Sequence, residues 1–335
     1  MSDARSRRAA TAPAARWDPS PRDEPARWGP VLAGREQDEA LTVATAIAAE
    51  LTTWPTTGAT LAGGSAGRAL LHARFADDAD QRDAGRTALR HAVGSLRTPG
   101  GPASLHLGAA GVGFVVAHLA GDLLDRRDRC GGVDRALTSL VDREPWTGLL
   151  DLMRGLVGIG VYALERLEVP AGPQLLARVV EHLDQGALRT PDGRTWWTPD
   201  EQLHDRSRRA SPDGHVDLGV AHGVPGIVAL LADACAADVA TEVARPLLHD
   251  AVAWLLATSV HDDRELTSWW TPGQPNHAGT GCCCCHRRWA DDPAGGAVAP
   301  VRYACERGHR RAPVRRGRCV HQPAHSRLPP RSRPR

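Results

Sequence analysis

The stretch VAHGVPGIVALLADAC, residues 220–235, joins two closely spaced glycines to an apolar segment, and the chain repeats this pattern. After Gly223 and Gly226, apolar residues recur at three- and four-residue spacing, which is typical of a helix with a buried face. Three earlier segments follow the same pattern: LAGGSAGRALLHARF (61–75), LHLGAAGVGFVVAHLAG (105–121) and LMRGLVGIGVYALERL (152–167). One Gly-x-x-Gly marks only the start of a helix, whereas four in register indicate a repeat architecture.

Other amphipathic segments lie beside the glycine-led ones and start at Glu36, Asp83, Gly172 and Val243. The repeating unit is therefore a pair of helices. Glycine at the start of the inner helix allows a sharp turn and a close approach of neighbouring helices. We therefore predict an all-α fold in which the hairpins form an α/α toroid rather than an open solenoid. Residues 189–215, rich in Pro, Gly and Asp, predict an extended loop between the last two repeats.

The amino terminus and the cysteines indicate an intracellular setting. Residues 1–33 place charges and prolines where an export signal needs an apolar run, so we predict a disordered N-terminal segment. No apolar run reaches the ~18 residues of a membrane span, and we expect a cytoplasmic protein. Cytosolic thiols stay reduced, so the cysteines are not a disulfide framework. Cys130 and Cys235 are predicted to be small buried hydrophobes.

Two polar residues within the repeats are candidates for chemistry. His222 directly precedes Gly223 in the fourth repeat, where the positive end of a helix dipole favours neutral imidazole. That form can act as a base or as a metal ligand. Asp151 lies four residues before Gly155 in the third repeat, among apolar neighbours. It is either a helix cap or a carboxylate held inside the fold for catalysis.

These residues carry a resemblance to a known family, the lanthionine synthetase C-like proteins, which are the cyclases of lanthipeptide biosynthesis. AHGVPGI is similar to the family's His-Gly-x-x-Gly turn, whose histidine lies in the active site. LLDLMRGLVGIGVYALERL resembles the family's Asp-containing third repeat, and LAGGSAGRALL and LGAAGVGF look like its earlier repeats. The resemblance covers roughly residues 36–276 and implies an α/α toroid.

The resemblance also implies a reaction. Such cyclases bind a precursor peptide whose Ser and Thr residues have been dehydrated, and they add a Cys thiol across the alkene to form a thioether ring. A separate dehydratase is then an expected partner. Zinc is the expected cofactor, because it binds the substrate thiol as thiolate. His222 would be the acid/base, and Asp151 would be its orienting or proton-accepting partner.

The resemblance ends near residue 277, because the expected Trp-Cys-Tyr-Gly-like and Cys-His-Gly turns, which carry the zinc ligands, do not follow. The chain reads GTGCCCCHRRW (279–289) instead, and helical periodicity stops. Three explanations are open: a metal site, a redox or regulatory tail, and a change of reading frame in a high-GC gene. Consecutive cysteines cannot all reach one tetrahedral ion, so we favour the third. We divide the chain into a toroid domain at 34–277 and an Arg/Cys/Pro-rich, disordered tail at 278–335, and we assign no metal ligands.

The charge distribution separates this tail from the rest of the chain. Residues 281–335 carry 13 Arg against three acidic residues, a net charge of +10, while the remainder carries −8. A basic tail on an acidic body is typical of a nucleic-acid-binding arm. A shifted frame of a high-GC gene also produces arginine, so we expect no nucleic-acid partner.

Three functions remain open for the chain. The first is a lanthipeptide cyclase impaired by loss of the zinc-ligand motifs, which leaves its enzymatic activity uncertain. The alternative is a non-catalytic α/α toroid that binds a peptide near His222 and Asp151 without zinc. A third is another toroid enzyme, prenyltransferase-like or glycosidase-like. A glycosidase needs paired carboxylates, and Asp151 has no repeat-equivalent partner.

Overall fold

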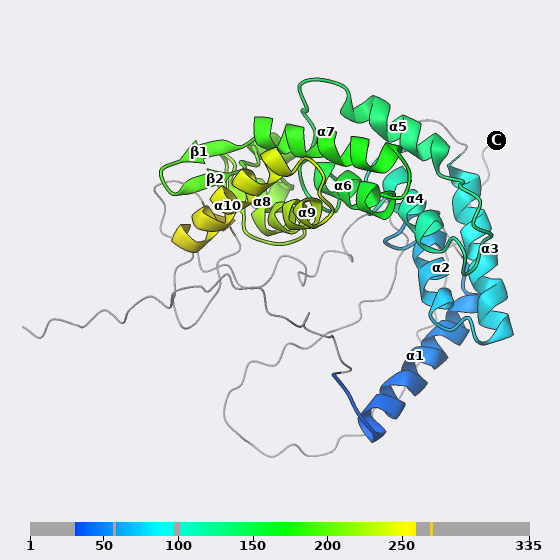
Figure 1. The fold of residues 1–335 in the computed structure, drawn as a ribbon. Coiled ribbons are helices and arrows are strands. Elements are labelled where there is room, and N and C mark those ends of the chain that lie inside the picture. Colours follow the sequence, from blue (N-terminus) through cyan, green and yellow to red (C-terminus); the bar gives the residue numbers. More distant parts are fainter. Residues whose placement is uncertain (1–30, 56–57, 97–100, 259–268, 271–335) are drawn as a thin grey trace, which may run out of the picture. The chain divides into compact units, whose positions relative to one another are not determined.

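The computed structural model describes residues 31–55, 58–96, 101–258 and 269–270 (Figure 1). The tail 278–335, which contains the cysteine run Cys282–Cys285, lies outside the described residues, as does most of the segment 1–33. The predicted disorder of both segments and the domain boundaries at 34 and 277 therefore stay predictions.

Helices make up most of the described chain, which confirms the predicted all-α class. They are α1 (Arg35–Thr53), α2 (Ser65–Ala73), α3 (Ala79–Ser95), α4 (Ala109–His118), α5 (Gly131–Val141), α6 (Leu156–Glu165), α7 (Ala171–Gln185), η1 (Asp200–Gln202), α8 (Asp205–Ala210), α9 (Val224–Ala236) and α10 (Thr241–Thr258). The described chain also contains short strands in two antiparallel pairs. β1 (Leu188–Thr190) pairs with β2 (Gly193–Thr195), and β3 (Val216–Asp217) pairs with β4 (Trp269–Trp270). No helix in the described ranges is both long and apolar enough to cross a membrane.

The helices pack in two layers, as a repeated helical pair predicts. In the first layer α2, α4, α6 and α9 follow one another, and each contacts the next. In the second layer α3, α5, α7 and α10 each pack against the glycine-led helix of their own pair (Figure 1). The amphipathic segments predicted from Glu36, Asp83, Gly172 and Val243 fall within α1, α3, α7 and α10.

The assignment of helices to the two layers follows from their sequences. α6, LVGIGVYALE, is apolar on all sides, and Leu156, Ile159 and Tyr162 are at most 2% exposed. A helix that is apolar all round needs neighbours on every face. α7 buries a single stripe that includes Leu176 and Val180 and leaves polar residues toward solvent. It therefore suits the second layer.

The glycine-led turns lie in a row that ties neighbouring repeats together. The N–H of Ala62 in the first turn donates to the carbonyl oxygen of His106 in the second, at 3.0 Å. The N–H of His106 in turn donates to the carbonyl oxygen of Met153 in the third, also at 3.0 Å. These two N–H groups are each hydrogen-bonded to a carbonyl oxygen of the next repeat. The first three turns are thus held in register by the main chain itself.

Glycine is required in these turns by close packing and not by an unusual backbone conformation. Gly223 has φ −134° and ψ −165°, an extended conformation open to any residue. A Cβ on Gly223, however, would stand 1.8 Å from the carbonyl oxygen of Asp217. At the second glycine of the third repeat, Gly158, a Cβ would meet the Leu152 carbonyl oxygen at 2.4 Å and the Leu105 Cβ at 2.8 Å. Only glycine lets the loop, the helix start and the preceding repeat approach so closely.

The insertion between the third and fourth repeats is more ordered than the extended loop that its composition predicts. It contains the β1–β2 hairpin, whose two strands are joined by Pro191 and Asp192, and then η1 and α8. Trp196 is 4% exposed, and its indole N–H donates to the carbonyl oxygen of Leu183 at 2.8 Å. The prediction was wrong because Pro, Gly and Asp dominated the composition, whereas one buried tryptophan fixes the segment against α7.

α5 was not predicted, because glycine at its start and polar residues along it weaken its apolar pattern. It is held against α6 by a buried charged network. Asp134 of α5 accepts hydrogen bonds from the Tyr162 hydroxyl at 2.5 Å and from the Arg166 guanidinium at 2.7 and 3.2 Å. The Asp134 and Arg166 side chains are each only 9% exposed. Burial alone disfavours the charged guanidinium, yet the hydrogen bonds from Arg166 to its acidic partners raise its pKa.

The start of α3 offers a direct test of local structure. The carboxylate of Asp78 accepts a hydrogen bond from the N–H of Gln81 at 3.0 Å. D78A is expected to lower the free energy of unfolding by about 1 kcal/mol, because one helix N–H loses its acceptor. Urea unfolding followed by circular dichroism measures this loss. D77A, at the exposed neighbouring position, is the matched control, and equal effects of the two variants would contradict the capping role.

Candidate active site

Asp151 lies in the turn before α6 and is 6% exposed. Its Oδ1 accepts hydrogen bonds from the N–H of Arg154 at 2.5 Å and from the N–H of Gly155 at 3.0 Å. The N-cap residue of α6 is Gly155, so Asp151 stabilises the turn without being the helix cap itself. These bonds use one carboxylate oxygen and leave Oδ2 for another partner.

His222 lies in the corresponding turn before α9, on a loop that begins at Asp217. A hydrogen bond of 2.8 Å from the N–H of Gly223 to the carbonyl oxygen of Gly219 closes this loop. The His222 side chain is 33% exposed. Its imidazole can therefore contact buried neighbours on one side and a molecule from solvent on the other.

The structure brings the two predicted residues together from adjacent repeats. His222 Nδ1 lies 2.9 Å from Asp151 Oδ2, although the residues are 71 positions apart in sequence. A carboxylate can only accept, so Nδ1 carries the hydrogen and donates it. In the neutral imidazole Nε2 then has a free lone pair, and among the described residues nothing donates to it. This is the arrangement in which an acid orients a histidine base and fixes its tautomer.

The environment of Asp151 favours its charged form. Burial by itself raises the pKa of this carboxyl group. The hydrogen bonds from His222 and from the N–H of Arg154 outweigh burial, and the pKa lies below its ordinary value. Asp151 is therefore ionised at neutral pH and can stabilise a positive charge on His222.

Two further titratable residues near this pair were not predicted. His106 lies in the turn before α4, and its pKa is lowered first by burial and then by the charge of His222, against the opposing charge of Asp151. Asp217 begins the His222 loop, and burial raises its pKa. Neither residue occupies a repeat position equivalent to His222 or Asp151, so the repeat pattern gave no signal. The only sequence signal was a polar residue shortly before a glycine pair.

The described residues contain no group of three or more His, Cys, Asp or Glu side chains that could hold a metal ion. Cys130 is 2% exposed, as predicted, and burial raises the pKa of its thiol to about 11. Cys235 in α9 is half-buried rather than buried. Neither thiol belongs to a group of three or more possible ligands, which a protein zinc site requires. The zinc expected from the resemblance thus has no fitting ligand set in this part of the chain, and Cys282–Cys285 lie outside it.

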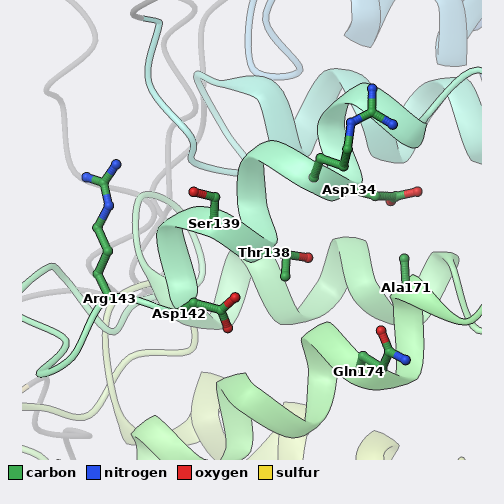
Figure 2. A pocket seen from close by; sticks show the side chains of 8 residues that line it. Asp134, Thr138, Ser139, Asp142, Arg143, Ala171 and Gln174 are labelled. Carbon is green, nitrogen blue, oxygen red and sulfur yellow. The ribbon is translucent and has the colours of Figure 1, made fainter.

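An open groove of about 490 Å³ lies elsewhere, between α5 and the start of α7 (Figure 2). Asp134 and Thr138 of α5, and Asp142 directly after it, face Ala171 and Gln174 of α7 across it. Figure 2 shows the Arg143 side chain directed away from the groove. No histidine or cysteine lines it, so we assign the chemistry to the His222–Asp151 pair.

The fold and the pair together define a class: a toroid of helical hairpins with a histidine and an aspartate at the junction of two repeats. Residues 55–281 match the family model for lanthionine synthetase C-like protein. The chain therefore belongs to the lanthionine synthetase C-like family, as the sequence predicted.

One solved structure that resembles this chain is that of nisin cyclase, with a TM-score of 0.53 and 21% sequence identity. The match covers 68% of this chain and 60% of the nisin cyclase chain. At this identity the likeness concerns the fold, and it confirms the predicted α/α toroid architecture. No match was found among the curated proteins.

Proposed function

We propose that this chain is a peptide cyclase that forms thioether rings by adding cysteine thiols to dehydrated Ser or Thr residues. The observation that carries the proposal is the 2.9 Å contact between His222 Nδ1 and Asp151 Oδ2, in a chain of the lanthionine synthetase C-like family. The name of its structural neighbour, nisin cyclase, agrees with this class of reaction.

The pair can move the one proton that the reaction requires. Nε2 of His222 takes the proton of the substrate thiol, and the sulfur then bonds to the β-carbon of the alkene. The electrons of the double bond form an enolate, and the imidazolium returns the proton to the α-carbon. Asp151 holds the imidazole in place and stabilises its positive charge while the proton resides there. Overall S–H adds across the double bond, and both residues regain their starting state.

Zinc, the cofactor expected of the family, would supply a substrate thiol that is already deprotonated. The described residues do not provide ligands that fit it, so we assign neither ligands nor a step to zinc. The turns expected to carry the zinc ligands are missing from the sequence after residue 277. We therefore propose that ring formation by this chain is slower than in a cyclase that carries them.

The substrate implied by this chemistry is a peptide that already contains an alkene. Such an alkene forms when Ser or Thr loses water, so a dehydratase must act on the precursor peptide before this chain does. We propose that both steps take place in the cytoplasm, where cysteine thiols stay reduced and remain available for addition.

A synthetic peptide with one dehydroalanine and one cysteine tests the proposal. With the full chain present, this peptide is expected to lose its free thiol faster than it does alone, at unchanged mass, because ring formation only rearranges bonds. Thiol alkylation followed by mass spectrometry measures the loss, with and without added zinc salt. The peptide alone gives the uncatalysed background, and a rate equal to that background in both arms would overturn the proposal.

The same peptide distinguishes the non-catalytic alternative, a toroid that only binds peptides. A binding protein would raise the fluorescence anisotropy of the labelled peptide without accelerating thiol loss. A peptide with serine in place of dehydroalanine is the matched control. It offers the same contacts but no alkene, so it is expected to bind and to keep its thiol.

A further inference from the structure

Asp217 lies at the point where β3 leads into the loop that carries His222. Its main chain pairs with Trp269 of β4 in an antiparallel ladder. The loop ends at Gly223, which begins the turn into α9. Asp217 and His222 thus lie on one short closed segment, fixed at one end by a strand pair and at the other by a helix.

The side chain of Asp217 folds into this loop. Its Oδ1 accepts a hydrogen bond from the N–H of Gly219 at 2.6 Å. The same oxygen lies 2.8 Å from the point where a Cβ on Gly223 would stand. Gly223 directly follows His222, so the carboxyl group lies against the main chain that presents the imidazole. Only glycine at position 223 leaves room for it.

The charges around the imidazole come from three sides. Asp151 contacts it from the turn before α6, while Asp217 in its own loop and His106 in the turn before α4 interact with it through their charges. Burial raises the pKa of Asp217, the hydrogen bond from Gly219 and the charge of His222 lower it, and the charge of Asp151 raises it. In Asp151 the balance is reversed, and its pKa is lowered. The two carboxyl groups therefore differ in acidity, and only Asp151 hydrogen-bonds the imidazole among the described residues.

We propose that Asp217 is a positioning residue of the site: its carboxyl group, which accepts from the N–H of Gly219 and lies against Gly223, fixes the loop that presents His222. It acts through His222 and not on the substrate. The inference rests on the proposed function only in taking His222 as the acid/base of ring formation. The placement of Asp217 and its effect on His222 can be tested even if the chain has no enzymatic activity.

The variants D217A and D217N separate the loss of the loop's hydrogen bond from the loss of charge. Alanine removes the oxygen that accepts from the N–H of Gly219, whereas asparagine keeps such an oxygen without the charge. In the full chain with ¹³C-labelled histidine, the His222 signal is identified by its absence from H222N. This signal is expected to shift in D217A and to return toward its original position in D217N, because only alanine releases the loop. D213A, at an exposed aspartate on the same segment, is the matched control and is expected to leave the signal in place.

The outcomes are distinct from those of the cyclisation assay. If D217A unfolds at the same urea concentration as the unchanged chain and its His222 signal does not shift, the proposed role of Asp217 is overturned. If the signal shifts in D217A alone although the chain does not cyclise the test peptide, the proposed function fails and the role of Asp217 stands. If the chain cyclises the peptide, D217A is expected to slow ring formation and D217N is expected to restore it.

Discussion

H222N is expected to slow thioether formation by roughly 10²–10⁴-fold, the contribution typical of a positioned acid/base. Asparagine can still donate to Asp151 Oδ2, so the turn before α9 keeps its hydrogen bond while the site loses the nitrogen that accepts the thiol proton. Thiol alkylation and mass spectrometry of the dehydroalanine peptide measure the rate. Peptide affinity is expected to change little, because the loss concerns proton transfer.

D151N completes this test from the other side of the pair. The N–H groups of Arg154 and Gly155 need an acceptor, so they hold the asparagine oxygen at the position of Oδ1. The amide nitrogen then faces His222 and donates to Nδ1, which moves the imidazole hydrogen to Nε2. The base is thereby lost although the shape is kept, and a rate loss similar to that of H222N is expected. Full activity of both variants would show that the pair does not carry the reaction.

D134A is expected to lower the free energy of unfolding by about 3–5 kcal/mol, the largest effect on stability that we predict. Removing Asp134 leaves the buried Arg166 guanidinium with Asp128, an exposed residue, as its remaining acidic partner, and breaking a buried ion pair from one side is strongly destabilising. The Tyr162 hydroxyl also loses its acceptor. Because this network lies between α5 and α6, its loss weakens the contact of the two layers. Urea unfolding followed by circular dichroism measures the change.

The exposed ion pair of Asp125 and Arg129 supplies the matched control. Both residues are solvent-accessible near the start of α5, and surface pairs contribute little to stability. D125A is therefore expected to leave the unfolding midpoint almost unchanged. A loss in D134A no larger than that in D125A would contradict the assignment of Asp134 as the buried partner of Arg166.

The sequence was most informative where burial alone decides the structure. Four segments led by Gly-x-x-Gly predicted the first-layer helices, because apolar residues at helical spacing after each glycine pair form a face that must be buried. The pattern marked Asp151 and His222 as separate candidates, and the resemblance to the family paired them. The turns of neighbouring repeats lie side by side, so residues just ahead of the helices come together.

Other features depend on contacts that a residue pattern does not contain. α5 is held by Asp134 and its partners, so charge pairing across two helices replaces the apolar stripe that would have marked it. The insertion is ordered by Trp196, a single residue whose partner, the Leu183 carbonyl oxygen, is a main-chain group of α7. Asp217 and His106 reach the site through the path of their loops, and that path is set by the packing of adjacent turns.

The contact between Asp151 and His222 makes the site a property of a junction between two repeats. Neither repeat contains it alone, and the residues that form it are separated in the chain by the β1–β2 hairpin and the rest of the insertion. A chain cut at the hairpin tip, between Pro191 and Asp192, would carry the carboxylate on one fragment and the imidazole on the other. Ring formation would then report reassembly of the two fragments, which makes this fold suited to a split-enzyme sensor.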